Sequence, residues 1–201
     1  MQPNSLAIYL VAGWSGYFVM ALELLGARSL SPYFGSGIYV WGAVITVFML
    51  SLSIGYLVGG QLSLERASTR VLGLLLLAAV AGAIPCVAFA EPVLEFVFNR
   101  VEDPRYGALL ASTLLFFAPI TICGAISPYA VRLVVANLGS TGRTAGLVFF
   151  ISTLGSTLGT LLTSFYLVLL FEVDQILIGM SVVSVLVAAN ALRFGNSESA
   201  P

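Results

Sequence analysis

The stretch Tyr39–Leu62, YVWGAVITVFMLSLSIGYLVGGQL, decides the fold because it contains no charged side chain. A helix needs about 20 mostly apolar residues to cross the hydrocarbon core of a bilayer. Five more stretches meet this requirement: Leu6–Ala27, Val71–Ala90, Tyr106–Ile126, Ala145–Phe171 and Gln175–Leu192. The sequence therefore predicts an all-α polytopic membrane protein with about six transmembrane helices. They form one domain over residues 1–194, and a disordered tail is expected at 195–201.

The composition excludes several function classes. Hydrophobic residues make up 59% of the chain and charged residues 8%, whereas a soluble domain has about a quarter charged residues. The net charge of −1 gives no reason to expect nucleic-acid binding, and no histidine is present. Cys86 and Cys123 lie in apolar runs and are expected to be buried, inert thiols. With no P-loop, HExxH or GxSxG motif either, we expect no catalytic residue, metal or cofactor, and no enzyme in this chain alone.

The arginines predict the orientation in the membrane. If the N-terminus is cytoplasmic, the inner side holds five arginines and the outer side three; the inner ones are Arg66, Arg70, Arg132, Arg143 and Arg193. The positive-inside rule then places both termini in the cytoplasm, and we expect a bacterial inner-membrane protein. On the outer side, the segment Glu91–Arg105 fits either a short helix lying on the membrane or an ordered loop.

Two local similarities raise the possibility of an internal repeat. Ser31-Pro32-Tyr33 is expected to follow the first helix and Ser127-Pro128-Tyr129 the fourth, and aligning Gly42 with Gly146 also aligns Gly55 with Gly159. The residue offset between the halves is eight smaller for the Ser-Pro-Tyr motifs than for the glycines. Each half would hold three helices, so the second copy would be inverted, as in many transporters. Duplication and chance similarity both stay open. We expect two GxxxG pairs, Gly55/Gly59 and Gly155/Gly159, to allow close helix packing.

Glu23 is the most notable polar residue, because its predicted helix contains no other charge before Arg28. A carboxylate in hydrocarbon must be protonated, paired or face a polar cavity. It is therefore either a cation or proton site or a structural contact between helices. Arg28 follows five residues later, about 140° around a helix, which argues against a direct pair. Arg132 is expected near the inner interface, where it contacts lipid or a partner. These three residues are the candidate substrate-binding or buried polar groups.

Several segments together carry a resemblance to a known family. They are ALELLGAR (21–28), SPYFGS (31–36), VWG (40–42), GYLVGG (55–60), GAISPYAVR (124–132), Gly142-Arg143 and STLGSTLGT (152–160). The series resembles the transmembrane region of membrane-bound spermidine synthase-like proteins, also described as fused transporter-type spermidine synthases. The resemblance covers the chain from about Leu6 to Leu192.

This resemblance implies a function for the chain. Family members typically join the membrane region to a cytoplasmic aminopropyltransferase-like domain, but no such domain is present here, so no catalytic residue carries over. We expect a membrane module that binds or transports a small polar or amphiphilic substrate, with a synthase-like partner subunit. The alternative is a scaffold that assembles a protein complex and transports nothing. Either function suggests a homo-oligomer or a hetero-complex within the lipid bilayer.

Overall fold

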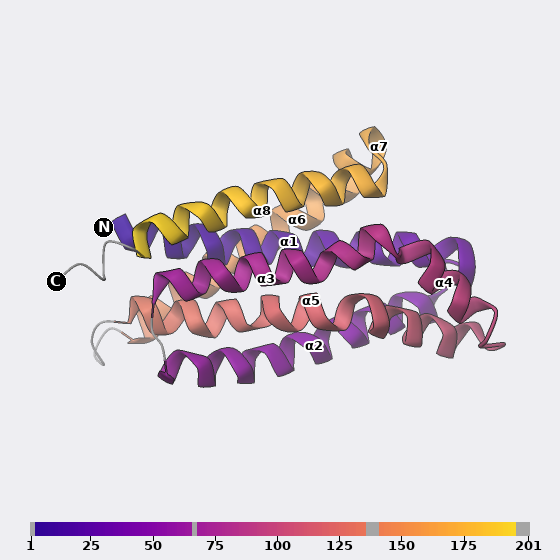
Figure 1. Ribbon diagram of the computed structural model, residues 1–201, viewed down its shortest axis with the longest axis horizontal. Helices are drawn as coiled ribbons and strands as arrows, with labels where there is room; N and C mark the ends of the chain where they lie inside the picture. Colours follow the sequence, from indigo (N-terminus) through magenta and orange to yellow (C-terminus); the bar gives the residue numbers. More distant parts are fainter. Residues whose placement is uncertain (1–2, 66–67, 136–140, 196–201) are drawn as a thin grey trace.

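The chain folds into a bundle of long helices (Figure 1). The computed structural model describes residues 3–65, 68–135 and 141–195. The helices are α1 Pro3–Phe34, α2 Ile38–Glu65, α3 Thr69–Ala88, α4 Ala90–Phe98, α5 Pro104–Val134, α6 Thr141–Leu162, α7 Val168–Leu170 and α8 Val173–Gly195, with a π-helical turn at Thr163–Leu167 between α6 and α7. Six of these segments are long and apolar enough to span a membrane. The predicted all-α membrane fold is confirmed, and the tail at 196–201 lies outside the described residues.

The spanning helices run alternately between two ends of the bundle. The short helices α4 and α7 lie at one end, here called the α4 end, and α1 begins and α8 finishes at the opposite, terminal end (Figure 1). Large side chains such as Leu57, Leu74 and Leu169 are exposed on the outside of the bundle. Because lipid tails are as apolar as these side chains, their exposure is what a membrane-embedded bundle requires.

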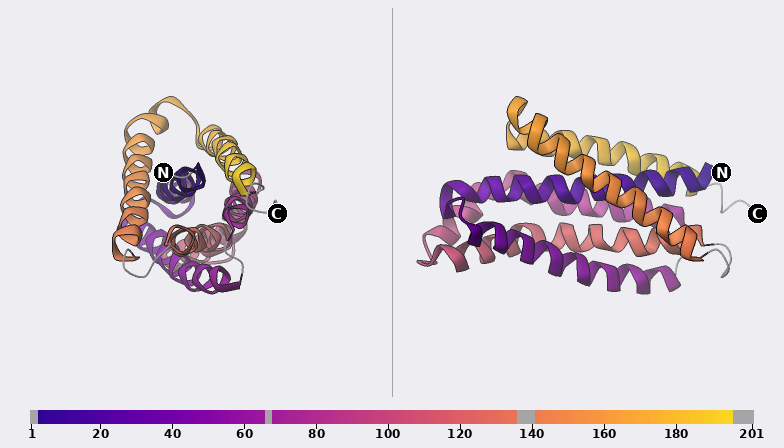
Figure 2. Two further views of the ribbon diagram at one scale, coloured as in Figure 1. Left: turned by 90° about the vertical axis from the view of Figure 1, so that its left-hand side faces the viewer. Right: turned by 180° about the vertical axis from the view of Figure 1, so that it is seen from behind.

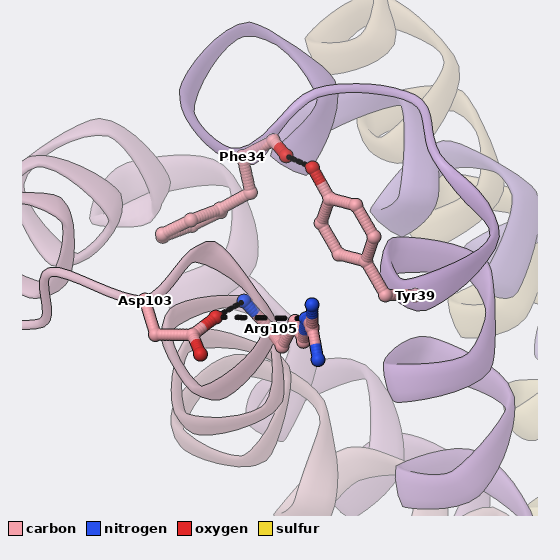
Figure 3. Close-up of polar contacts among 4 residues, drawn as sticks. All are labelled: Phe34, Tyr39, Asp103 and Arg105. Atoms are coloured by element: carbon pink, nitrogen blue, oxygen red, sulfur yellow. Dashed lines mark hydrogen bonds and ion pairs between the residues drawn. The ribbon is translucent and has the colours of Figure 1, made fainter.

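The helices extend beyond the predicted ranges, and this corrects the placement of both Ser-Pro-Tyr motifs. Pro32 lies inside α1 and Pro128 lies inside α5, so neither motif follows its helix. A proline removes one backbone hydrogen bond, and membrane helices tolerate this where neighbouring groups compensate. The α1 helix instead stops at Gly35, whose φ of 82° favours glycine. Across this turn, the Tyr39 hydroxyl donates to the Phe34 carbonyl at 2.8 Å (Figure 3).

The segment Glu91–Arg105 combines a short helix with a capped connection. Its helical part belongs to α4, which turns Leu94 and Val97 into the protein core, so these two side chains do not lie on the membrane. Asp103 then caps α5, because its carboxylate accepts a hydrogen bond from the Arg105 backbone N–H at 2.9 Å. The Arg105 side chain lies 4.0 Å from the same carboxylate oxygen (Figure 3).

The two GxxxG pairs lie where helices approach most closely. A Cβ built on Gly59 of α2 would lie 2.2 Å from the carbonyl oxygen of Ala125 on α5. A Cβ on Gly155 of α6 would lie 1.9 Å from the carbonyl oxygen of Gly13 on α1. Real side chains do not fit at such distances, so backbone packs directly on backbone in both pairs. As a result, α2 is held against α5 and α6 against α1.

The main helix contacts correspond when α1, α2 and α3 are exchanged with α5, α6 and α8, although the contact of α1 with α3 has no comparable counterpart between α5 and α8. The α2–α5 contact corresponds to α6–α1, and α3–α5 corresponds to α8–α1. Gly55 packs on Thr121 and Gly159 packs on Tyr17, so both members of one contact lie 104 residues from their counterparts. The Ser-Pro-Tyr motifs, at an offset smaller by eight residues, do not follow this correspondence. That the halves arose by duplication stays a prediction.

Gly59→Ala is expected to destabilise the protein, whereas the neighbouring Gly60→Ala is expected to be tolerated. The added methyl at residue 59 meets the α5 backbone, and overpacking of this kind costs about 1–3 kcal/mol. At Gly60, a Cβ meets no atom within 4 Å. Thermal unfolding in mild detergent measures both variants, and equal midpoints for the two would contradict the packing described here.

Candidate functional site

A small cavity lies where α1, α2, α5 and α6 meet, and hydroxyl groups line much of it. Its volume is about 90 Å³, enough for a few water molecules or part of a small ligand. Ser15 comes from α1, Tyr56 from α2, Ser127 from α5, and Ser152 and Ser156 from α6. We call this space the central cavity. It lies close to the middle of α1, and therefore near mid-depth in a membrane-spanning bundle.

Most of these hydroxyls have no partner within the described part of the chain. Ser15 donates to the Ala12 carbonyl of its own helix at 2.9 Å. Tyr56, Ser127, Ser152 and Ser156, by contrast, donate no hydrogen bond to any described residue. Serine and threonine in membrane helices usually bond back to their own helix. Four hydroxyls that do not are free to bond water or a ligand.

Glu23 extends this polar surface toward the α4 end. It lies four residues after Val19 and three after Met20, which both line the cavity, so it shares their face of α1. Its side chain is partly buried, and it forms no hydrogen bond or ion pair with any described residue. Placing a charged side chain in hydrocarbon costs about 3 kcal/mol at the centre of a membrane helix. Glu23 therefore requires water, a proton or a cation next to it.

The structure does not bring the three predicted polar residues together. α1 is continuous from Glu23 to Arg28, so the two side chains stay on different faces, and Arg28 is exposed. Arg132 is exposed in the last turn of α5, at the terminal end. Arg28 and Arg132 are 104 residues apart, which gives them equivalent positions in the two sets of three helices. Neither arginine lines the central cavity.

A second, larger pocket at the α4 end is acidic, and sequence reasoning missed it. It measures about 460 Å³ and is lined by Glu91, Glu172 and Asp174, together with Tyr33 and Cys86. Glu91 lies in the first turn of α4, whereas Glu172 and Asp174 lie at the start of α8, so the carboxylates are distant in sequence and no local motif indicates the pocket. In the described residues, no three of the His, Cys, Asp and Glu side chains lie close enough to hold a metal ion. The pocket lies against α3 and α8, apart from the central cavity.

Trp14 has a structural role that the sequence did not indicate. Its indole N–H donates to the Ser184 hydroxyl at 2.7 Å and so ties α1 to α8. Its ring also stacks on Tyr17, with centroids 4.8 Å apart. The residue therefore fixes the helix packing next to the cavity.

The central cavity is expected to hold water, and cysteine labelling tests this. After Cys86→Ala and Cys123→Ala, a thiol at Ser127→Cys should react with a small charged thiosulfonate reagent. A thiol at Ser112→Cys should not react, because Ser112 is fully buried on the same helix and does not line the cavity. If the thiol at Ser127→Cys is as unreactive as the one at Ser112→Cys, the cavity is closed to water.

Comparison of the chain with protein-family models, curated proteins and solved structures found no match.

Proposed function

We propose that the chain is a membrane transport module that binds and passes a small polar substrate carrying positive charge. The observation that carries the proposal is the central cavity, where Tyr56, Ser127, Ser152 and Ser156 present unpaired hydroxyls and Glu23 lies one turn away. Ionisable groups inside a membrane protein are costly and mark substrate or ion pathways. What distinguishes the cavity is that four unpaired hydroxyls gather there beside Glu23, whereas Ser112 and Thr163 are single buried hydroxyls elsewhere in the bundle that have no partner among the described residues.

The position of the cavity supports transport. In transporters built from inverted repeats, the substrate binds near mid-membrane where the two repeats meet. Here the cavity takes residues from α1 and α2 on one side and from α5 and α6 on the other. Val19 and Cys123 both line it and are 104 residues apart, as are Leu52 and Ser156. If the two halves are inverted copies, the cavity straddles the axis that relates them.

Charge favours a cationic substrate. Glu23 is the charged residue nearest the cavity along α1, and the pocket at the α4 end adds three carboxylates. No arginine lines either site. An acidic site concentrates cations by electrostatic attraction. A polyamine fits this chemistry and also fits the resemblance to spermidine synthase-like proteins, in which a soluble partner would act on the amine. The arginine distribution would place the α4 end outside the cell.

The GxxxG pairs do not support the scaffold alternative. Both GxxxG pairs are used inside the chain, Gly55 and Gly59 against α5 and Gly155 and Gly159 against α1. They are therefore not available to recruit another protein. A scaffold would have to bind its partners through other surfaces of the bundle. The scaffold hypothesis also does not explain why unpaired hydroxyls line the cavity.

Glu23→Gln is expected to reduce spermidine uptake into proteoliposomes, because the amide keeps the shape of the side chain but loses its charge. Losing a hydrogen bond to a charged group costs about 2 kcal/mol, or roughly thirtyfold in affinity. Glu95→Gln is the control, since Glu95 is exposed on α4 and lines neither site. Uptake that is the same for both variants and the unmodified protein removes the proposed role of Glu23.

A further inference from the structure

An apolar groove runs along the outer side of α3 and α8. Figure 2 shows these two helices side by side at one edge of the bundle, with α6 on the opposite side of α1. The groove has a volume of about 490 Å³. We call it the α3–α8 groove; its lining residues are Val80, Ile84 and Ala88 of α3, and Ile178, Ser181, Val182, Val185 and Leu186 of α8.

The α3–α8 groove presents an apolar surface to the membrane. Ile84, Ile178 and Val182 are each more than half exposed, although they line the groove. The Ser181 hydroxyl donates to the Leu177 carbonyl of its own helix at 2.8 Å, so it is already paired. A hydrocarbon chain suits this surface, because it covers no polar group that needs a partner and gains close contacts with aliphatic side chains.

The groove meets the acidic pocket at the α4 end. Ala88 lines both spaces, and the lining residues of α3 recur every four positions until they reach it. On α8, Asp174 of the acidic pocket is followed at the same spacing by Ile178 and Val182 of the groove. Residues four apart lie on one face of a helix. Both walls of the groove therefore continue directly to the carboxylates.

The charge at this end of the groove selects the head of an amphiphilic ligand. The three carboxylates of the acidic pocket form no ion pair with any described residue. Two arginines at the α4 end contact other groups, since Arg105 lies beside Asp103 and Arg100 lies over the Phe96 ring. An acidic pocket attracts a cationic head and repels an anionic one. A phospholipid fits poorly, because no basic side chain lines the pocket to receive its phosphate.

We propose that the α3–α8 groove and the acidic pocket together bind a single-chain amphiphile whose head is an amine or a quaternary ammonium. The alkyl chain lies between α3 and α8, and the head lies among the carboxylates of Glu91, Glu172 and Asp174. One chain fits, because each helix contributes one face to the groove. The site shares no lining residue with the central cavity, so it is a second site beyond the one proposed for transport.

Photolabelling in phosphatidylcholine nanodiscs tests where the amphiphile binds. The probe is a dodecyltrimethylammonium that carries a diazirine in its chain, and peptide mass spectrometry locates the label. We expect labels on residues 80–88 and 178–186. Unlabelled dodecyltrimethylammonium should remove them. Dodecylphosphocholine, which has the same chain without net charge, and tetramethylammonium, which has the charge without the chain, should not.

Two pairs of variants separate the head from the chain. Glu172→Gln/Asp174→Asn should weaken probe binding about tenfold, because two exposed charge pairs are lost. Glu95→Gln/Glu102→Gln is the control, since it removes the same charge from exposed positions outside the pocket.

The second pair obstructs the chain. Val182→Trp should abolish labelling by filling the groove, whereas Leu114→Trp, at a similarly exposed position of α5, should not. Labels spread equally over lipid-facing positions such as Leu114 would overturn the proposal. Equal competition by dodecylphosphocholine, or unchanged binding after Glu172→Gln/Asp174→Asn, would also overturn it, and neither result requires the tryptophan variants to fold. So would a co-purified phospholipid in the groove that dodecyltrimethylammonium does not displace.

Discussion

The rest of the structure depends on two places where helix backbones touch without side chains between them. Gly59 brings α2 onto α5, and Gly155 brings α6 onto α1. In lipid no hydrophobic effect drives helices together, so close packing at small residues has to hold them. As a result, α2 packs on α5 and α6 packs on α1, and α1 and α5 lie between these two outer helices. Because α2 and α6 have few contacts with each other, space for the central cavity remains where the four helices meet.

The polar chemistry is concentrated where this packing leaves space. The unpaired hydroxyls of Ser127 and Ser156 come from different helices and line the same cavity, and Glu23 continues the polar surface along α1. Elsewhere the bundle presents leucine and phenylalanine to the membrane. Arg28 and Arg132, in contrast, lie exposed at equivalent positions of the two sets of helices. Their equivalent positions suit a role at the two membrane surfaces. Neither arginine could contact a substrate in the cavity unless the helices moved.

The length of the hydrophobic stretches alone predicted the six spanning helices. Burying a charge in lipid is costly, so each spanning segment is visible in the sequence as an uninterrupted apolar stretch. Helical periodicity also anticipated that Glu23 and Arg28 would not pair. The prediction that the first helix ends before Ser31-Pro32-Tyr33 was wrong, because a proline ends helices in water more readily than in a membrane bundle. The acidic pocket could not be foreseen, because Glu91 and Asp174 meet only through the tertiary fold. The same holds for the hydrogen bond from Trp14 to Ser184.

The central claim is that α6 separates lipid on one face from the water-containing central cavity on another. Spin labels placed singly along α6 in lipid nanodiscs test it through their collision rates with oxygen and with a water-soluble nickel chelate. The account predicts oxygen-dominated collisions at Leu154, Leu158 and Leu161, which are exposed, and nickel-dominated collisions at Ser152 and Ser156, which line the cavity. Oxygen-dominated collisions at all five positions would contradict it, because the cavity would then be filled by lipid.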